Sequence, residues 1–141
     1  MIKIQKEDFN IEVEIELIKS LLPSVGAVTS FIGYVRDFNN NKNVNSINLE
    51  VYEKMVHKEL TKITVKAKQK WELIDCLIVH RHGYLEVNEK IVLVACFAKH
   101  RQESFNACNY IMNYLKKYAP FWKKENYTNN SNNSEWLENT N

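Results

Sequence analysis

Apolar residues recur along the chain in two rhythms, one typical of strands and one typical of helices. Residues 2–5 read IKIQ and residues 25–36 read VGAVTSFIGYVR, and three further stretches are VNSINLEVY from residue 44, LIDCLIVHRHG from residue 73 and KIVLVACFAKH from residue 90. Their β-branched residues and short apolar runs favour strands. The polar cluster DFNNNKN, residues 37–43, lies between the second and third stretches and predicts that these two form a hairpin.

Three longer stretches favour helices. The first, IEVEIELIKSLL from residue 11, is ambiguous, because its apolar residues alternate like those of a strand and also fit one helix face. Its length, its helix-forming residues and Asn10 as a cap favour a helix that ends before Pro23. A second, amphipathic helix is predicted over residues 53–71. Its apolar stripe consists of Val56, Leu60, Ile63 and Ala67.

The third helix is predicted from Arg101 to Tyr118, and Pro120 stops it. Its expected apolar side consists of Phe105, Cys108, Met112 and Leu115. The stretch GYLEVNE, residues 83–89, separates the last two strands and reads as a turn, because Gly83 and Asn88 tolerate the positive φ angles that turns require.

The resulting order, βαββαββα, predicts an α+β fold in which a mostly antiparallel sheet has helices packed on one face. A chain of 141 residues suffices for one domain with a real core, and we place this domain at residues 1–125. Residues 126–141 form a polar, Asn-rich C-terminal tail that we expect to be partly mobile. Within the tail, Trp136 and Leu137 are apolar and can anchor it to the domain or to a partner.

The charge balance disfavours partners that need a strongly basic chain. Nineteen Lys and Arg face 17 Asp and Glu, which gives a net charge of +2, so neither nucleic acid nor an anionic membrane is indicated. The first residues contain no apolar core of signal-peptide length, and no run approaches the roughly 18 apolar residues of a membrane span. We therefore expect a cytoplasmic protein.

Cysteines and histidines do not combine into a metal site. Cys76, Cys96 and Cys108 have no CxxC spacing and lie among apolar neighbours, which predicts buried free thiols. His80 and His82 share one face of a predicted strand, but no carboxylate or thiol at suitable spacing supplies a third ligand.

Candidate chemistry lies where cations meet the ends of predicted elements. Arg36 ends a strand, His100 and Arg101 occupy a strand-to-helix junction, and Lys116 and Lys123 flank the predicted helix stop. If these ends meet at one edge of the layer, their donors suit a phosphate or a carboxylate. Taken singly, each residue is more readily a surface cation, and only the set favours an anion site.

The segment KKYAPFWKKE, residues 116–125, places lysines among three aromatic residues and a proline. Lys116 follows Met112 by one helical turn, and Lys123 follows two aromatic residues. Desolvation and a second ammonium nearby favour a neutral amine that can act as base or nucleophile. Lysines in a last helical turn also complement the helix dipole, and spacing alone favours that simpler interpretation.

Five blocks of the sequence carry a family resemblance. They read GAVTSFIGYVRD, LEVYEKM, VHRHGYLEVNE, AKHR and IMNYLKKYAPFWKKE and occur in this order within residues 26–125. In these blocks the chain resembles the MoaE family, the catalytic (large) subunit of molybdopterin synthase. The last block is the most specific, because a lysine, Pro-Phe-Trp and Lys-Lys-Glu follow an amphipathic helix at fixed spacing.

The resemblance implies an α/β hammerhead-type fold and a sulfurtransferase of molybdenum cofactor biosynthesis. The family converts cyclic pyranopterin monophosphate to molybdopterin with sulfur from the C-terminal Gly-Gly thiocarboxylate of a small ubiquitin-like carrier subunit (MoaD-like). The sulfur thus arrives on the partner, and no metal or organic cofactor is implied. The chain is expected to form the homodimeric core of a heterotetramer.

Site residues are carried over from the family's motifs. The resemblance implies Lys116 and Lys123 as catalytic residues. The implied substrate-binding residues are Tyr34, Val35, Arg36, His100, Arg101, Lys116, Lys123, Lys124 and Glu125.

The alternative interpretation is an RNA-binding α+β module. In it, Tyr118, Phe121 and Trp122 would stack on bases amid the lysines of residues 116–125. The low net charge speaks against this alternative.

Overall fold

The computed structural model describes residues 1–128 and 134–137, which contain three helices and nine strands. The helices are α1 (Ile11–Lys19), α2 (Glu53–Trp71) and α3 (Arg101–Tyr118). The strands are β1 (Ile2–Gln5), β2 (Ala27–Tyr34), β3 (Phe38–Asn39), β4 (Lys42–Val51), β5 (Asp75–Arg81), β6 (Gly83–Glu86), β7 (Lys90–Ala98), β8 (Phe121–Tyr127) and β9 (Ser134–Leu137). The predicted α+β class is confirmed, while β3, β6, β8 and β9 have no counterpart in the predicted order.

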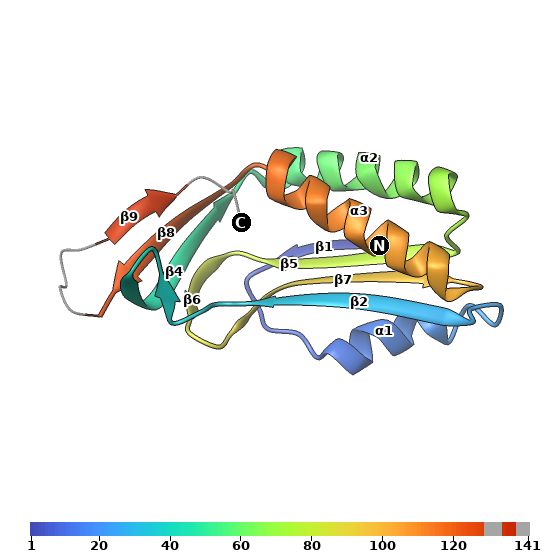
Figure 1. The fold of residues 1–141 in the computed structure, drawn as a ribbon, viewed down its shortest axis with the longest axis horizontal. Coiled ribbons are helices and arrows are strands. Elements are labelled where there is room, and N and C mark those ends of the chain that lie inside the picture. The colour runs from blue at the N-terminus through green and yellow to red at the C-terminus, as the bar shows by residue number, and fades with distance from the viewer. Residues whose placement is uncertain (129–133, 138–141) are drawn as a thin grey trace.

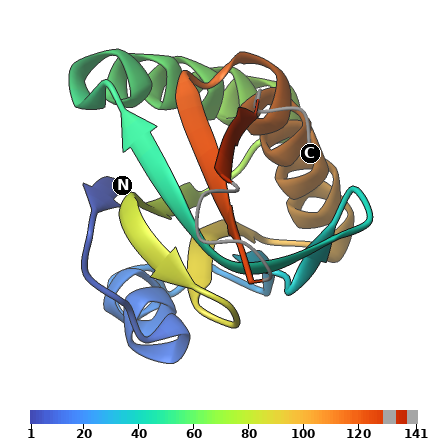
Figure 2. The same cartoon turned by 90° about the vertical axis from the view of Figure 1, so that its left-hand side faces the viewer.

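The strands form two sheets. The first has the order β1-β5-β7-β2, and only its β1–β5 pair is parallel. The second has the order β3-β4-β8-β9, with β6 paired to β4. It stands at one end of the first sheet, as Figure 1 shows, and the view onto that end in Figure 2 has β4, β8 and β9 in front. The two sheets therefore meet where β2, β5 and β7 end or begin.

The predicted hairpin between residues 25–36 and 44–52 is wrong. β2 pairs along its length with β7, so that Ala27 lies opposite Ala98 and Ile32 opposite Leu93. The polar cluster does form a turn, with positive φ angles of 51° at Asn40 and 61° at Asn41. That turn joins β3 to β4 in the second sheet. It does not join β2 to its partner, because β2 pairs with β7, which lies far along the chain.

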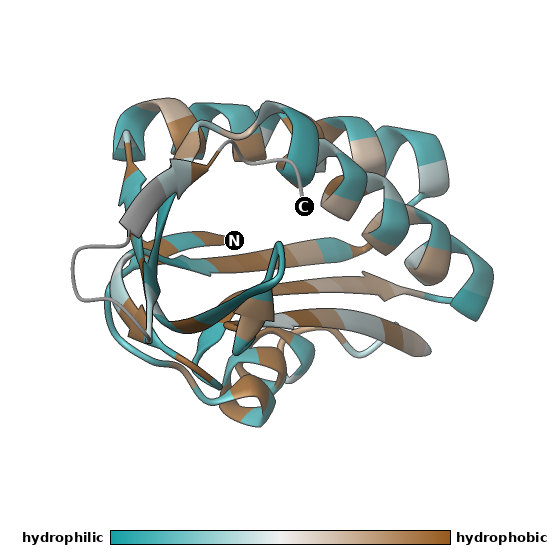
Figure 3. Ribbon diagram, turned by 60° about the vertical axis from the view of Figure 1, so that its left-hand side comes forward, coloured by the Kyte–Doolittle hydropathy of each residue, from teal (hydrophilic) through white to brown (hydrophobic). Residues whose placement is uncertain are grey.

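The helices cover both faces of the first sheet. α2 and α3 pack on one face and α1 on the other (Figure 1). Successive side chains of β5 point to opposite faces, and accordingly Ile78 belongs to the core under α2 and α3, whereas Leu77 packs toward α1. The prediction that the helices pack on one face of the sheet is therefore correct for α2 and α3 and wrong for α1. Figure 3 shows the strands of this sheet as a largely hydrophobic layer.

Local signals within the helices are mostly confirmed. The Asn10 side chain caps α1 by accepting a hydrogen bond from the Val13 backbone N–H at 3.0 Å, and α1 ends before Pro23. The predicted stripe of α2 is fully buried. Phe105 of α3 is 57% exposed, so its predicted place in the core is wrong. Cys108 and Leu115 are buried as predicted, Met112 is half-buried, and the buried stripe of α3 also contains Ser104, Ala107 and Ile111.

The segment between β5 and β7 is more than a turn. Residues 83–86 form β6, which pairs with β4, although Gly83 and Asn88 have the predicted positive φ angles of 89° and 72°. The three predicted free thiols are confirmed, since Cys76, Cys96 and Cys108 are all buried and unbridged.

The C-terminal part of the described chain is a strand pair. β8 continues past residue 125 to Tyr127, and β9, which carries Trp136 and Leu137, pairs with it. Most of the Asn-rich run for which mobility was predicted, residues 129–133 and 138–141, lies outside the described residues. No helix in the described part of the chain is long and apolar enough to cross a membrane.

Candidate active site

A cavity of about 440 Å³ lies where the two sheets meet α3. Its wall is largely apolar and comes from β2, β4, β7, α3 and β8. The apolar lining residues are Phe31, Ile32, Ile47, Leu49, Ile91, Val92, Met112, Leu115 and Phe121. A wall of this kind suits the flat face of a ring system.

Three cations line the same cavity. Arg36 follows β2, Lys116 lies in the last turn of α3, and Lys123 lies in β8. Arg36 and Lys116 are exposed, while Lys123 is half-buried. Arginine and lysine have only donors to offer, so the cavity combines an apolar wall with a set of donors for an anion. The structure thus brings together Arg36, Lys116 and Lys123, as the sequence predicted.

The pleat of β8 separates its neighbouring lysines. Phe121, Lys123 and Glu125 point to the side of the cavities, whereas Lys124 lies on the other side, with its Nζ 5.8 Å from the centre of the Trp136 ring. Lys124 therefore lines neither cavity of this site. Its role in binding substrate stays a prediction.

Glu125 lies beside the main cavity in a second, smaller one of about 90 Å³. Tyr34, Val35, Arg36 and Lys123 also line this space. The Glu125 side chain is only 3% exposed and accepts a hydrogen bond from Asn39 Nδ2 at 2.9 Å. The buried Glu125 carboxyl group thus lies near two of the cations, Arg36 and Lys123.

His100 and Arg101 lie far from this cavity within one chain. β2 and β7 are antiparallel, so Tyr34 is opposite Lys90 at the cavity, while the opposite end of β7 leads to His100. Arg101 begins α3 and Lys116 lies near its end, which separates them by about 22 Å along the helix axis. The predicted convergence of all these cations at one edge is therefore wrong within a single chain.

His80 also belongs to this cavity, although the sequence pattern indicated it only as a candidate metal ligand. It is the next-to-last residue of β5, lines the cavity and is 8% exposed. Its ring stacks on Phe121 with centroids 3.8 Å apart, and its Nδ1 lies 2.8 Å from the Arg81 carbonyl oxygen. Burial is the main reason that the pKa of His80 falls from 6.5 to about 4, so the imidazole is neutral at pH 7. Its place near the end of a predicted strand was a local signal, but that signal does not show which strands meet there.

The cysteines supply no nucleophile to the site. None of the three lines the cavity. Hydrogen bonding to the Cys108 and Cys76 thiols, together with burial, raises the pKa of Cys96. The hydrogen bond with Cys96 lowers the pKa of Cys108, but this thiol is buried and does not line the cavity.

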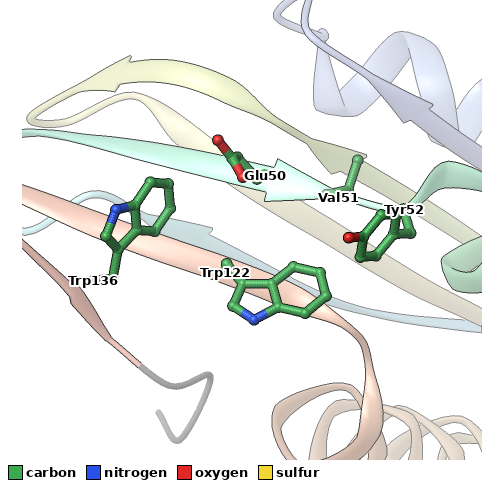
Figure 4. Close-up of a pocket in the computed structure, with 5 residues that line it drawn as sticks. All are labelled: Glu50, Val51, Tyr52, Trp122 and Trp136. Atoms are coloured by element: carbon green, nitrogen blue, oxygen red, sulfur yellow. The ribbon is translucent and has the colours of Figure 1, made fainter.

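A separate aromatic surface lies around Trp122 (Figure 4). Glu50, Val51, Tyr52, Trp122 and Trp136 line a shallow pocket there. The Tyr52 and Trp122 rings meet edge to face with centroids 5.0 Å apart. Phe121 is instead buried against His80. Phe121 and Trp122 therefore face opposite sides of β8 and form no common platform for stacking bases, which argues against the RNA-binding alternative.

Several proteins of known function or structure are similar to this chain. The molybdopterin synthase catalytic subunit of Ralstonia nicotianae is 48% identical over 124 residues, which cover 88% of this chain and 70% of that protein. The MoaE protein of Burkholderia ambifaria MC40-6 has a TM-score of 0.85 and 38% identity, over 100% of this chain and 90% of that chain. For molybdopterin synthase of Staphylococcus aureus the TM-score is 0.85, with 28% identity over 96% and 95% of the two chains.

The similarity of sequence and fold assigns the chain to a protein family. The family described as "MoaE protein" matches residues 4–118, and the chain belongs to this family. Its activity is that of a molybdopterin synthase catalytic subunit, in molybdenum cofactor biosynthesis.

Proposed function

We propose that the cavity binds cyclic pyranopterin monophosphate and that sulfur reaches it from the thiocarboxylated C-terminus of a small carrier subunit. The observation that carries this proposal is the convergence of Arg36, Lys116 and Lys123 from three separate elements on one cavity. The cations suit the phosphate, and the apolar wall suits the pterin ring. A carrier's Gly-Gly end has no side chains, so its backbone can approach the cavity closely.

Two kinds of step need these residues. The thiocarboxylate sulfur forms a bond to a substrate carbon as a carbon–oxygen bond of that carbon breaks, and the oxygen leaves as water or stays on the phosphate when the cyclic phosphate opens. Water then cleaves the acyl–sulfur bond, so that the carrier leaves as a carboxylate and its sulfur stays on the substrate. Opening the cyclic phosphate and completing each transfer require proton movement, for which Lys116 and Lys123 are the proposed groups. Two such rounds supply both sulfurs of the dithiolene.

His100 and Arg101 enter this proposal through a second copy of the chain. Because they lie about 20 Å or more from Lys116 in their own chain, they can contact substrate only in the cavity of a partner chain. We propose a homodimer in which His100 and Arg101 of each chain contribute to the cavity of the other chain. One carrier subunit binds to each chain. The buried free thiols fit a reducing cytoplasm, where we place the complex.

The direct test mixes the purified chain, a thiocarboxylated carrier and cyclic pyranopterin monophosphate, and measures dithiolene product. Lys116→Arg and Lys123→Arg keep the charge, but arginine does not release its proton at working pH. We expect kcat to fall about 100-fold in each. The matched control is Lys117→Arg, an exposed lysine of the same helical turn that does not line the cavity.

Two results would count against the proposal. If the intact chain forms no product where a known synthase does, the substrate assignment is wrong. If both arginine variants are fully active, the two lysines act only as charges.

The sharing of residues between chains has its own test. A chain with Lys116→Ala is co-expressed with a chain that carries Arg101→Ala, and mixed dimers are purified with two different tags. Sharing predicts that each mixed dimer regains one intact cavity and about half of the wild-type activity, as expected for one of two independent sites. If Arg101 acts within its own chain, both cavities of the mixed dimer stay defective.

A further inference from the structure

His80 is held at the cavity in one orientation. Phe121 covers one face of its ring at a centroid distance of 3.8 Å and an interplanar angle of 17°. A carbonyl oxygen only accepts hydrogen bonds, so the 2.8 Å contact with the Arg81 carbonyl requires the proton on Nδ1. Arg81 is itself fixed, because its side chain donates to the backbone carbonyls of Lys6 and Lys90.

The other ring nitrogen, Nε2, is left with a free lone pair. In a neutral imidazole one nitrogen donates and the other accepts, and burial keeps this ring neutral. In the described part of the chain, Glu103 Oε2 is the side-chain atom that is both fully buried and without a partner. His80 Nε2 is not such an atom, which agrees with its being accessible from the cavity. Since His80 lines the cavity, the small exposed part of the ring faces a space that a ligand can enter.

Among the described residues that line the cavity, only His80 and the Tyr34 hydroxyl offer a nitrogen or oxygen acceptor on a side chain. The three cations of the cavity only donate, and the remaining side chains of its wall are apolar apart from Tyr34. Glu125 accepts from Asn39 in the neighbouring cavity. A pterin ring carries N–H donors, and a buried donor without an acceptor weakens binding.

We propose that His80 Nε2 accepts a hydrogen bond from a ring N–H of the pterin and so orients the ring while the cations hold the phosphate. This inference rests on the proposed function, which supplies a substrate with both parts. His80 is thereby a specificity residue: it selects a ring with an N–H donor, whereas Arg36, Lys116 and Lys123 select the anion. A protonated His80 would lose the acceptor and add a fourth positive charge.

The test compares His80→Phe with His80→Gln in the full chain. Phenylalanine keeps a flat ring against Phe121 but has no acceptor, whereas glutamine keeps an acceptor oxygen. We measure KM and kcat for cyclic pyranopterin monophosphate, and the inhibition constant of inorganic phosphate, which needs only the cations. His57→Phe, at an exposed histidine of α2, is the control.

His80→Phe is expected to raise KM about tenfold or more, with the phosphate inhibition constant changed less than about twofold. His80→Gln is expected to recover most of the loss. An unchanged KM in His80→Phe overturns the proposal, and so does an equal loss of substrate and phosphate binding in both variants, which would mark His80 as a purely structural support. Failure of the wild-type chain to turn over substrate refutes the proposed function instead.

Discussion

The buried His80 predicts a specific loss of stability in acid. Its pKa is about 4 in the folded chain, against 6.5 for an ordinary histidine. The unfolded chain therefore takes up the proton first as the pH falls, so the contribution of His80 to stability is present above pH 6.5 and is lost toward pH 4. Linkage gives a loss of about 2 kcal/mol between pH 7 and pH 5 from this residue alone.

The assay is urea unfolding of the wild-type chain and of His80→Gln at pH 7, 6 and 5. His80→Gln has no group to protonate, so its free energy of unfolding should fall by about 2 kcal/mol less than that of the wild type over this range. Asp8 also loses stabilisation in acid, because its pKa is lowered, mainly by the hydrogen bond from the Phe9 backbone N–H. That loss is common to both proteins and cancels in the difference.

The matched control is His57→Gln, since His57 is exposed on α2, and its pH dependence should follow the wild type. Equal pH dependence of wild type and His80→Gln would refute the reasoning, because it would mean that the imidazole charges freely in the folded chain. An NMR titration of the His80 ring signals gives an independent check, because this ring should still be neutral at pH 5.

Three further substitutions test the fold, each by urea unfolding at pH 7. Ile63→Ala removes a fully buried side chain of α2 and should cost about 2–5 kcal/mol, against less than about 0.5 for the half-exposed Val65→Ala. Asn10→Ala removes the cap of α1 and should cost about 1 kcal/mol. Gly26→Ala should destabilise as well, since its Cβ would lie 2.3 Å from the Lys99 carbonyl oxygen; wild-type stability there would contradict the close approach.

Features that depend on neighbours in sequence were predictable. The apolar stripe of α2 and the cap at Asn10 are set within a few residues, by helical periodicity and by one side chain that reaches the next turn. The pair Lys116 and Lys123 does not belong to this group, because spacing alone favoured lysines that complement the helix dipole, and the family resemblance singled the pair out. The three buried thiols followed from their apolar neighbours.

Features that depend on strand pairing were not predictable from the sequence. A polar turn after β2 suggested pairing with the next strand, but β2 pairs with β7, more than 50 residues along the chain. That pairing also sends His100 to the far end of the sheet, because antiparallel neighbours bring the end of one strand to the start of the other. His80 was missed for the same reason: its place at the cavity comes from β5 pairing with β7 and from the stacking of Phe121.

Strand register also decides which of two adjacent lysines faces the cavity. Leu49 of β4 lies opposite Lys123, and both line the cavity. A slip of β8 by one residue would reverse every side chain of the strand and bring Lys124 to the cavity in place of Lys123. Pairing on both sides opposes such a slip, because Lys123 also lies opposite Leu137 of β9. The sequence pair Lys123-Lys124 contains no such information, and the identity of the cavity lysine is therefore a property of the second sheet as a whole.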